Sequence, residues 1–229
     1  RQFLKYLSKN DIASLDSNKV ELAKQEPRQV TFLEGYDLAA FLQAPLATPK
    51  SSKLVKLRDR AILEMLFSTG LRVSELARLK INDLNLKKTE FTVRGKGSKL
   101  RLVFLSNDAK AAVKTYLEAR QDTEPFLFVG HGKINKETNP QYGLTPRSIE
   151  RLVEKYAVAA GITKKVTPHT LRHSFATDLL IGGADIRSGQ QLLGHASITT
   201  TQVYTHVTDQ QLRQVYQNFH GKSRQKIDK

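Results

Sequence analysis

The chain has 229 residues, enough for one large domain or two small ones, and no apolar run approaches the roughly 20 residues that a membrane span needs. It contains no cysteine, which excludes disulfides, thiolate catalysis and cysteine-ligated zinc, and we expect a cytoplasmic protein. Its 37 Lys and Arg residues against 22 Asp and Glu leave a net charge of +15, which points to a polyanionic partner.

The basic residues are spread along a well-patterned globular chain rather than gathered in one amphipathic helix. This distribution favours nucleic acid over an anionic membrane as the partner. A ribosomal or merely soluble basic protein is the alternative that composition alone leaves open.

The hydrophobic pattern predicts a mainly α fold with a small antiparallel β-sheet, in the α+β class. Residues 1–9 have the pattern of the end of an amphipathic helix, and the polar stretch 10–31 is predicted to be a linker. A short helix at 34–44 is expected to end at Pro45, because proline cannot donate a backbone hydrogen bond.

Further along, apolar residues at helical spacing from Leu57 predict a longer helix that ends at Gly70. Two runs rich in β-branched and apolar residues, 89–93 and 100–105, predict a hairpin with the basic tip RGKGSK at 94–99. The other expected elements are a short helix at 73–79, a helix at 108–120, a strand or buried segment at 126–130, a polar loop at 131–146, a helix at 147–160, a helix from Pro168, a helix at 185–193, a helix from Ser197 and a short helix at 208–217.

The stretch TPHTLRH at 167–173 combines a helix start with basic side chains. Thr167 is a suitable N-cap and Pro168 suits the first helical position. His169 and Arg172 then share one face of the first turn, where the free N–H groups of a helix already favour phosphate. A capped helix with a surface arginine and a core histidine is the alternative for this stretch alone.

The stretch STGLRVSEL at 68–76 places Arg72 just before a helix and Glu75 one turn later. An arginine held by a neighbouring carboxylate has a planar guanidinium that is already oriented to donate two N–H groups to a phosphate. A surface ion pair of little energy is the alternative.

In the hairpin tip, Lys96 lies between Gly95 and Gly97, without the spacing of a Walker A loop. A lysine there could reach a DNA backbone or deliver a proton. Taken singly, a solvated turn lysine is the simpler interpretation.

The stretch LLGHASITTTQVYTHV at 192–207 raises the question whether Tyr204 is a half-buried aromatic residue or a nucleophile. A free phenol has a pKa of about 10, so its ionisation at pH 7 costs roughly 4 kcal/mol. If Tyr204 is reactive, cationic groups elsewhere in the chain must offset this cost. His169 and His173 have the spacing of a helical metal pair, but there is no HExxH glutamate, so we expect no metal.

Together, TGLRVSEL, the hairpin lysine, HTLRH and LLGHASITTTQVYTHV resemble, in order and spacing, the motifs of the tyrosine recombinases of the phage integrase family, especially the Xer-type chromosome-dimer resolvases. The resemblance covers about residues 54–216 and implies the catalytic-domain fold of that family. It further implies that 1–31 is the end of a truncated N-terminal core-binding domain with its linker, that 32–217 is the catalytic domain, and that 218–229 is a basic C-terminal tail.

Carried over to matching positions, the resemblance implies a set of catalytic residues, with Glu75 as support for the first arginine. The implied catalytic residues are Arg72, Lys96, His169, Arg172, His195 and Tyr204. Further DNA contacts are expected from Arg94, Lys99, Arg101, Arg147 and Thr170. The implied reaction joins Tyr204 to a 3′-phosphate of double-stranded DNA and passes through a Holliday junction, with neither metal nor other cofactor.

The resemblance also implies a homo- or hetero-tetramer on two DNA sites, joined through the C-terminal segment, for chromosome-dimer resolution or for integration and excision of a mobile element. Two alternatives stay open. A type IB topoisomerase uses a similar tyrosine and arginines, but the HTLRH and LLGH spacings favour the recombinase. A non-catalytic DNA-binding protein could keep the fold alone, but the presence of Tyr204 with its partners argues against it.

Overall fold

The computed structural model describes residues 1–21, 31–49, 51–95, 100–131 and 143–184, together with Leu192, residues 216–218 and His220. Contacts divide the chain into two units, Arg1–Val30 and Thr31–Lys229. The assignment of these units to parts of known domains stays a prediction.

In the smaller unit, the predicted N-terminal helix is confirmed as α1 (Gln2–Lys9), whose residues are all at least partly exposed. A 3₁₀ turn at Ser17–Lys19 lies in the predicted linker. The Nε atom of Arg1 donates a hydrogen bond to the carbonyl of Val20 over 2.8 Å, which links the start of this unit to the residue after the 3₁₀ turn.

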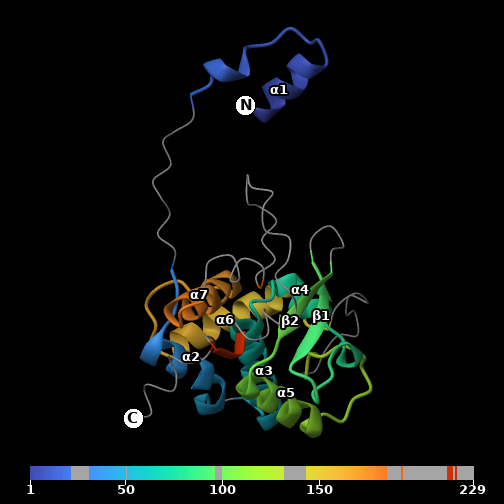
Figure 1. The fold of residues 1–229 in the computed structure, drawn as a ribbon, viewed down its shortest axis with the longest axis vertical. Coiled ribbons are helices and arrows are strands. Elements are labelled where there is room, and N and C mark those ends of the chain that lie inside the picture. Colours follow the sequence, from blue (N-terminus) through green and yellow to red (C-terminus); the bar gives the residue numbers. More distant parts are fainter. Residues whose placement is uncertain are drawn as a thin grey trace. The chain divides into compact units, whose positions relative to one another are not determined.

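The larger unit is mainly helical and carries one two-stranded antiparallel sheet, so the predicted fold class is confirmed (Figure 1). Its elements are α2 (Gly35–Ala47), α3 (Lys53–Thr69), α4 (Val73–Arg78), a 3₁₀ turn (Ile81–Asp83), β1 (Glu90–Arg94), β2 (Leu100–Phe104), α5 (Asn107–Ala119), α6 (Pro146–Ala159) and α7 (Pro168–Ile181). No helix in the described part of the chain is both long enough and apolar enough to cross a membrane.

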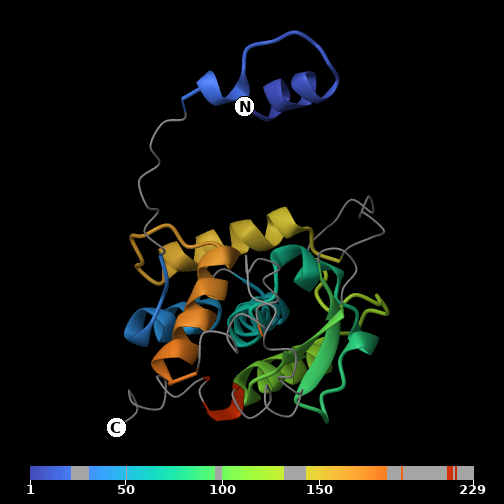
Figure 2. The ribbon, with the colours of Figure 1, turned by 45° about the horizontal axis from the view of Figure 1, so that its top comes forward.

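Helix α3 is the centre of this unit. It begins at the N-cap Ser52, whose hydroxyl accepts a hydrogen bond from the backbone N–H of Val55, and every residue from 61 to 69 is buried. A helix buried on all sides must be covered by neighbours. It packs against α2, α5 and α7, with α2 and α7 to one side and α5 and the hairpin to the other (Figure 2).

The turn after α3 is made by Gly70, as the sequence predicts. Its φ of 58° lies in the left-handed region that glycine adopts without steric cost, and its N–H donates to the carbonyl of Leu66 over 3.1 Å. This turn sends the chain directly into α4, so Arg72 lies beside the end of the most buried helix.

The hairpin is confirmed with Val93 opposite Arg101 and Arg94 opposite Leu100. Its inner face is buried through Phe91, Val93 and Val103, and the backbone N–H of Ser106, just after β2, donates to the hydroxyl of Ser68 in α3 over 2.7 Å. The hairpin is therefore anchored to the core at its base. Residues 96–99 of its tip lie outside the described residues.

The prediction that Pro45 ends its helix is wrong. Helix α2 continues through Pro45 to Ala47. A proline near the end of a helix removes only one backbone hydrogen bond. Here Pro45 is buried, and the hydroxyl of Thr48 donates to the carbonyl of Ala44 over 2.9 Å, which satisfies an acceptor at the helix end.

Of the two predictions for 126–130, the buried segment is confirmed. It makes a single bridge, between Lys80 and Phe126, instead of a strand ladder. The guanidinium of Arg120 donates to the carbonyls of Phe126 and Leu127 over 2.8 and 2.9 Å. An arginine side chain therefore satisfies acceptors that a neighbouring strand would otherwise have to satisfy.

Two of the described residues near the C-terminus, Tyr216 and His220, pack against this same chain. Tyr216 is buried, its hydroxyl lies 2.8 Å from the hydroxyl of Ser68, and its ring stacks on Phe104. Nδ1 of His220 lies 3.0 Å from a carboxylate oxygen of Asp178 in α7. Residues 216–218 are helical, whereas the helices expected at 185–193 and from Ser197 lie outside the described residues, apart from Leu192.

Candidate functional site

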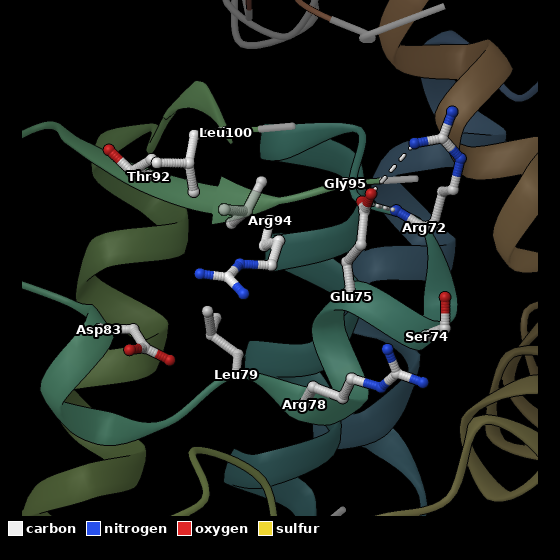
Figure 3. Close-up of a pocket in the computed structure, with 11 residues that line it drawn as sticks. Arg72, Ser74, Glu75, Arg78, Leu79, Asp83, Thr92, Arg94, Gly95 and Leu100 are labelled. Carbon is white, nitrogen blue, oxygen red and sulfur yellow. Dashed lines mark hydrogen bonds and ion pairs between the residues drawn. The ribbon is translucent and has the colours of Figure 1, made fainter. Parts of the chain in front are cut away.

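Arg72 and Glu75 form the pair that the sequence predicts. Arg72 occupies the N-cap of α4, and Glu75 is the third residue of that helix. The Glu75 carboxylate accepts hydrogen bonds from the backbone N–H of Arg72 over 2.8 Å and from its Nη1 atom over 3.0 Å (Figure 3). A glutamate at this position satisfies an N–H group that the start of a helix leaves unpaired. It thereby also orients the arginine side chain.

A second arginine, Arg101 of β2, binds the same carboxylate. Its Nη1 and Nη2 atoms donate to the two Glu75 oxygens, each over 2.8 Å. Burial by itself raises the pKa of Glu75, but the hydrogen bonds from Arg101 and from the Arg72 backbone outweigh it, so that this pKa lies below its usual value. Glu75 is therefore ionised at neutral pH and holds both arginines.

Arg172 of α7 completes an arginine cluster, which we define as Arg72, Arg101 and Arg172. Its Nη1 atom donates to the carbonyl of Gly70, and the residue is only 4% exposed. Burial lowers the pKa of Arg172 to about 10, helped by the nearby charges of Arg72 and Arg101. It still carries its charge at neutral pH. The cluster thus has three positive charges around the one negative charge of Glu75.

Helix α7 presents a histidine pair beside this cluster. Thr167 caps the helix as predicted, by accepting a hydrogen bond from the N–H of Thr170 over 3.2 Å. The Nε2 atoms of His169 and His173 lie 2.9 Å apart, so one ring donates to the other. Burial lowers the pKa of His173, and the neighbouring His169 and Arg172 lower it further. His169, Arg172 and Arg72 line a common pocket.

A larger open cavity of about 770 Å³ lies between α4 and the hairpin. Arg94 extends from β1 into this space, which Arg72 and Arg78 also line, with Asp83 as an acidic group at its edge (Figure 3). Three arginines thus outnumber the two carboxylates, Glu75 and Asp83, in the lining of this cavity, and the excess of positive charge favours an anion.

Four of the predicted site residues are not among those that the structure describes. Lys96, Lys99, His195 and Tyr204 lie outside the described residues, and their roles stay predictions.

The remaining predicted DNA contacts differ in their surroundings. Arg147 is exposed at the start of α6 and pairs with Glu150 over 3.0 Å. Thr170 is buried and is engaged in capping α7 with Thr167. Arg101 lies on the inner face of the hairpin, a placement that the two-residue period of Val103 and Arg101 could have indicated.

Comparison with known proteins agrees with this geometry. The model of the phage integrase family matches residues 32–211, and the chain therefore belongs to that family. It is a Xer-like tyrosine recombinase, an enzyme class that breaks and rejoins DNA.

Two relatives show the extent of the similarity. Tyrosine recombinase XerC of Thermodesulfovibrio yellowstonii is 37% identical over 98% of this chain and 74% of its own length. Tyrosine recombinase XerA of Pyrococcus furiosus is 49% identical over 69% of this chain and 54% of its own length.

Solved structures show the same fold. The XerA recombinase crystal structure matches with a TM-score of 0.61 and 33% identity, over 93% of this chain and 70% of that chain. The XerH recombinase bound to its difH substrate before cleavage matches with a TM-score of 0.64 and 29% identity, over 92% of this chain and 60% of that chain. A lambda integrase tetramer bound to a Holliday junction, at 19% identity and a TM-score of 0.62, covers 90% of this chain and 57% of that chain and is evidence for the fold alone.

Proposed function

We propose that this chain binds double-stranded DNA and cleaves one strand with Tyr204 as the nucleophile. The observation that carries the proposal is the charge of the arginine cluster. Arg72 and Arg101 hydrogen-bond to the Glu75 carboxylate and the charge of Arg172 lies near them, so the cluster itself carries more positive than negative charge, which favours an anion. A phosphodiester placed beside Arg72 and Arg172 would accept hydrogen bonds from guanidinium groups that are already oriented.

The reaction that fits this cluster is phosphoryl transfer. The oxygen of Tyr204 attacks the phosphorus in line, a 3′-phosphotyrosyl bond forms, and the bond to the 5′-oxygen breaks. Arg72, Arg172 and His195 bind the non-bridging oxygens, where charge develops in the transition state. Removal of one such donor typically lowers the rate by about 10²–10³, so these groups together can offset the roughly 4 kcal/mol that the neutral phenol costs.

Two further groups are proposed for proton transfer. Lys96 protonates the leaving 5′-oxygen, and His169 accepts or relays the proton of Tyr204. The hydrogen bond between His169 and His173 supports the second assignment, because it gives His169 a partner that can fix its tautomer. In the second half of the reaction, the 5′-hydroxyl of the partner strand attacks the phosphotyrosine and restores the DNA backbone. The covalent link conserves the bond energy, so we expect no cofactor.

We also propose that the chain acts as a homo- or hetero-tetramer on two DNA sites in the cytoplasm, in dimer resolution or in integration and excision. The similar XerH recombinase has been solved bound to its difH substrate, which supports the DNA part of this proposal. Because Tyr216 and His220 pack against their own chain, the contact with a neighbour is assigned to residues beyond His220. Truncation after His220 should reduce strand exchange more than DNA binding, whereas equal loss of both would argue against this assignment.

Trapping of the covalent intermediate tests the proposed chemistry. A pool of nicked duplexes with randomised sequence around the nick is incubated with the chain, and the covalently bound duplexes are sequenced. We call the enriched duplex the trapped duplex. The wild-type chain should form a covalent complex at one phosphate, and Tyr204→Phe should form none. No complex with the wild-type chain, or an undiminished complex with Tyr204→Phe, would refute the catalytic role of Tyr204. Relaxation of any supercoiled plasmid without site preference would support the topoisomerase alternative.

A further inference from the structure

Arg101 and Glu75 make the most tightly defined side-chain contact of the site. Two guanidinium nitrogens of Arg101 meet the two oxygens of one carboxylate, and both distances are 2.8 Å. The side chain of Arg101 is 11% exposed and that of Glu75 is 7% exposed. A paired, largely buried guanidinium is poorly placed to contact the backbone of bound DNA.

The same carboxylate also receives both hydrogen bonds from Arg72. An ionised carboxylate has about four acceptor positions, and here four N–H donors occupy them, two from Arg72 and two from Arg101. With its acceptor positions filled, Glu75 cannot rotate without losing a hydrogen bond. The Arg72 side chain, 34% exposed, is therefore held by a fixed carboxylate while it faces the open cavity.

Arg101 also joins two parts of the site. It lies opposite Val93, at the end of the hairpin strands nearest the tip and only a few residues from Lys96 along the chain, whereas Glu75 belongs to α4. The bidentate contact thus ties the hairpin to the helix that carries Arg72. It also compensates the charge of Glu75, which would otherwise act on Arg72 alone and weaken its attraction for a phosphate.

We propose that Arg101 is a positioning residue for strand cleavage rather than a DNA contact: it orients Arg72 through Glu75 and ties the end of the hairpin strands nearest the tip to α4. This inference rests on the proposed function, since it needs Arg72 to bind the reacting phosphate. It replaces the expectation from the sequence that Arg101 touches DNA directly.

Single-turnover cleavage of the trapped duplex by the full chain tests the inference. The variants are Arg101→Gln and Arg101→Lys, and Lys114→Gln on the exposed face of α5 is the charge-matched control. Loss of an outer group that orients a reacting one typically costs about 10–100-fold. Both Arg101 variants should therefore cleave about tenfold or more slowly than the control. Arg101→Lys should not restore the cleavage rate, because an ammonium group cannot bind both carboxylate oxygens as the planar guanidinium does.

Two further measurements separate positioning from contact. The slope of log DNA affinity against log salt, measured by fluorescence anisotropy, should match that of Lys114→Gln, because Arg101 itself touches no phosphate. A direct phosphate contact would instead lower the salt slope by about one for Arg101→Gln and be largely restored by lysine. In a Glu75→Gln background, the further change Arg101→Gln should slow cleavage by much less than it does alone.

The outcomes are distinguishable. If the wild-type chain forms no covalent complex, the proposed function fails. If it cleaves and Arg101→Gln cleaves equally fast, or loses the same factor with and without Glu75, the positioning role is refuted. Urea unfolding of each variant checks its fold, and Arg101→Lys, which retains the charge, decides the question if Arg101→Gln does not fold.

Discussion

The guanidinium of Arg172 donates a hydrogen bond to the main-chain carbonyl of Gly70, although 102 positions separate the two residues. This contact ties the N-terminal part of α7 to the turn between α3 and α4, where Arg72 is the N-cap of α4. The two arginines proposed to bind the reacting phosphate are thus placed relative to each other by a backbone acceptor. The carbonyl of Gly70 bears no formal charge, so this hydrogen bond orients the guanidinium of Arg172 without cancelling its charge.

Arg172→Lys should slow cleavage of the trapped duplex by about 10²-fold or more, because a lysine cannot both reach the Gly70 carbonyl and present a fork to the phosphate. Arg120→Lys is the matched control, since Arg120 also has a largely buried side chain and donates to backbone carbonyls, in a segment away from the cluster. Both variants should lose about 1–3 kcal/mol of unfolding free energy in urea. Equal cleavage rates for the two folded variants would contradict the proposed role of Arg172.

Gly70→Ala should lower the unfolding free energy by about 1–2 kcal/mol, because its φ of 58° is left-handed and strained for alanine. It should also slow cleavage, since the carbonyl of Gly70 orients Arg172. Gly161→Ala provides the control: its φ is 74°, and an added Cβ would meet nothing within 4 Å. Urea unfolding should show similar losses for both, whereas only Gly70→Ala should reduce single-turnover cleavage. A comparable loss of activity in Gly161→Ala would mean that strain alone explains the effect.

DNA binding by this chain should be strongly salt-dependent, because a basic protein releases counterions from the phosphates that it neutralises. Arg94→Gln should lower the slope of log affinity against log salt by about one, since Arg94 extends into the cavity beside Arg72 (Figure 3). Lys114→Gln should leave the slope unchanged. Anisotropy titrations at several salt concentrations give both slopes, and an unchanged slope for Arg94→Gln would exclude Arg94 from the DNA interface.

The histidine pair predicts a dependence of stability on pH. The pKa of His173 is lowered in the folded chain, through burial and the adjacent His169 and Arg172, so the unfolded chain binds its proton more readily. This contribution to stability is complete above the ordinary histidine pKa of about 6.5 and is lost as the pH falls below it. As the pH falls from about 7.5 to 5.5, the unfolding free energy of His173→Gln should therefore rise relative to that of the wild type, as measured in paired urea titrations. A constant difference between the two proteins would contradict the shift.

Features of this fold that depend on near neighbours in sequence could be predicted. Gly70 ends α3 because only glycine adopts its φ freely, and Thr167 with Pro168 begins α7 because capping acts within one turn. The pairing of Arg72 with Glu75 spans three residues of one helix start, so spacing alone sufficed. Pro45 misled because its burial in the last turn of α2 outweighs one missing hydrogen bond, and burial is not visible in a local pattern.

What the sequence alone determined is therefore the helical α+β class, the hairpin, the family, and the set of residues proposed for catalysis. Only the tertiary structure showed that Arg101 reaches Glu75 across 26 positions and that Arg172 reaches the carbonyl of Gly70 across 102. The physical reason is one of range. Backbone geometry confines caps, turns and neighbouring ion pairs to a few residues, so they can be derived from spacing. The partner of a distant side chain depends instead on how helices and strands pack, and here the packing of α7 and the hairpin around α3 and α4 decided it.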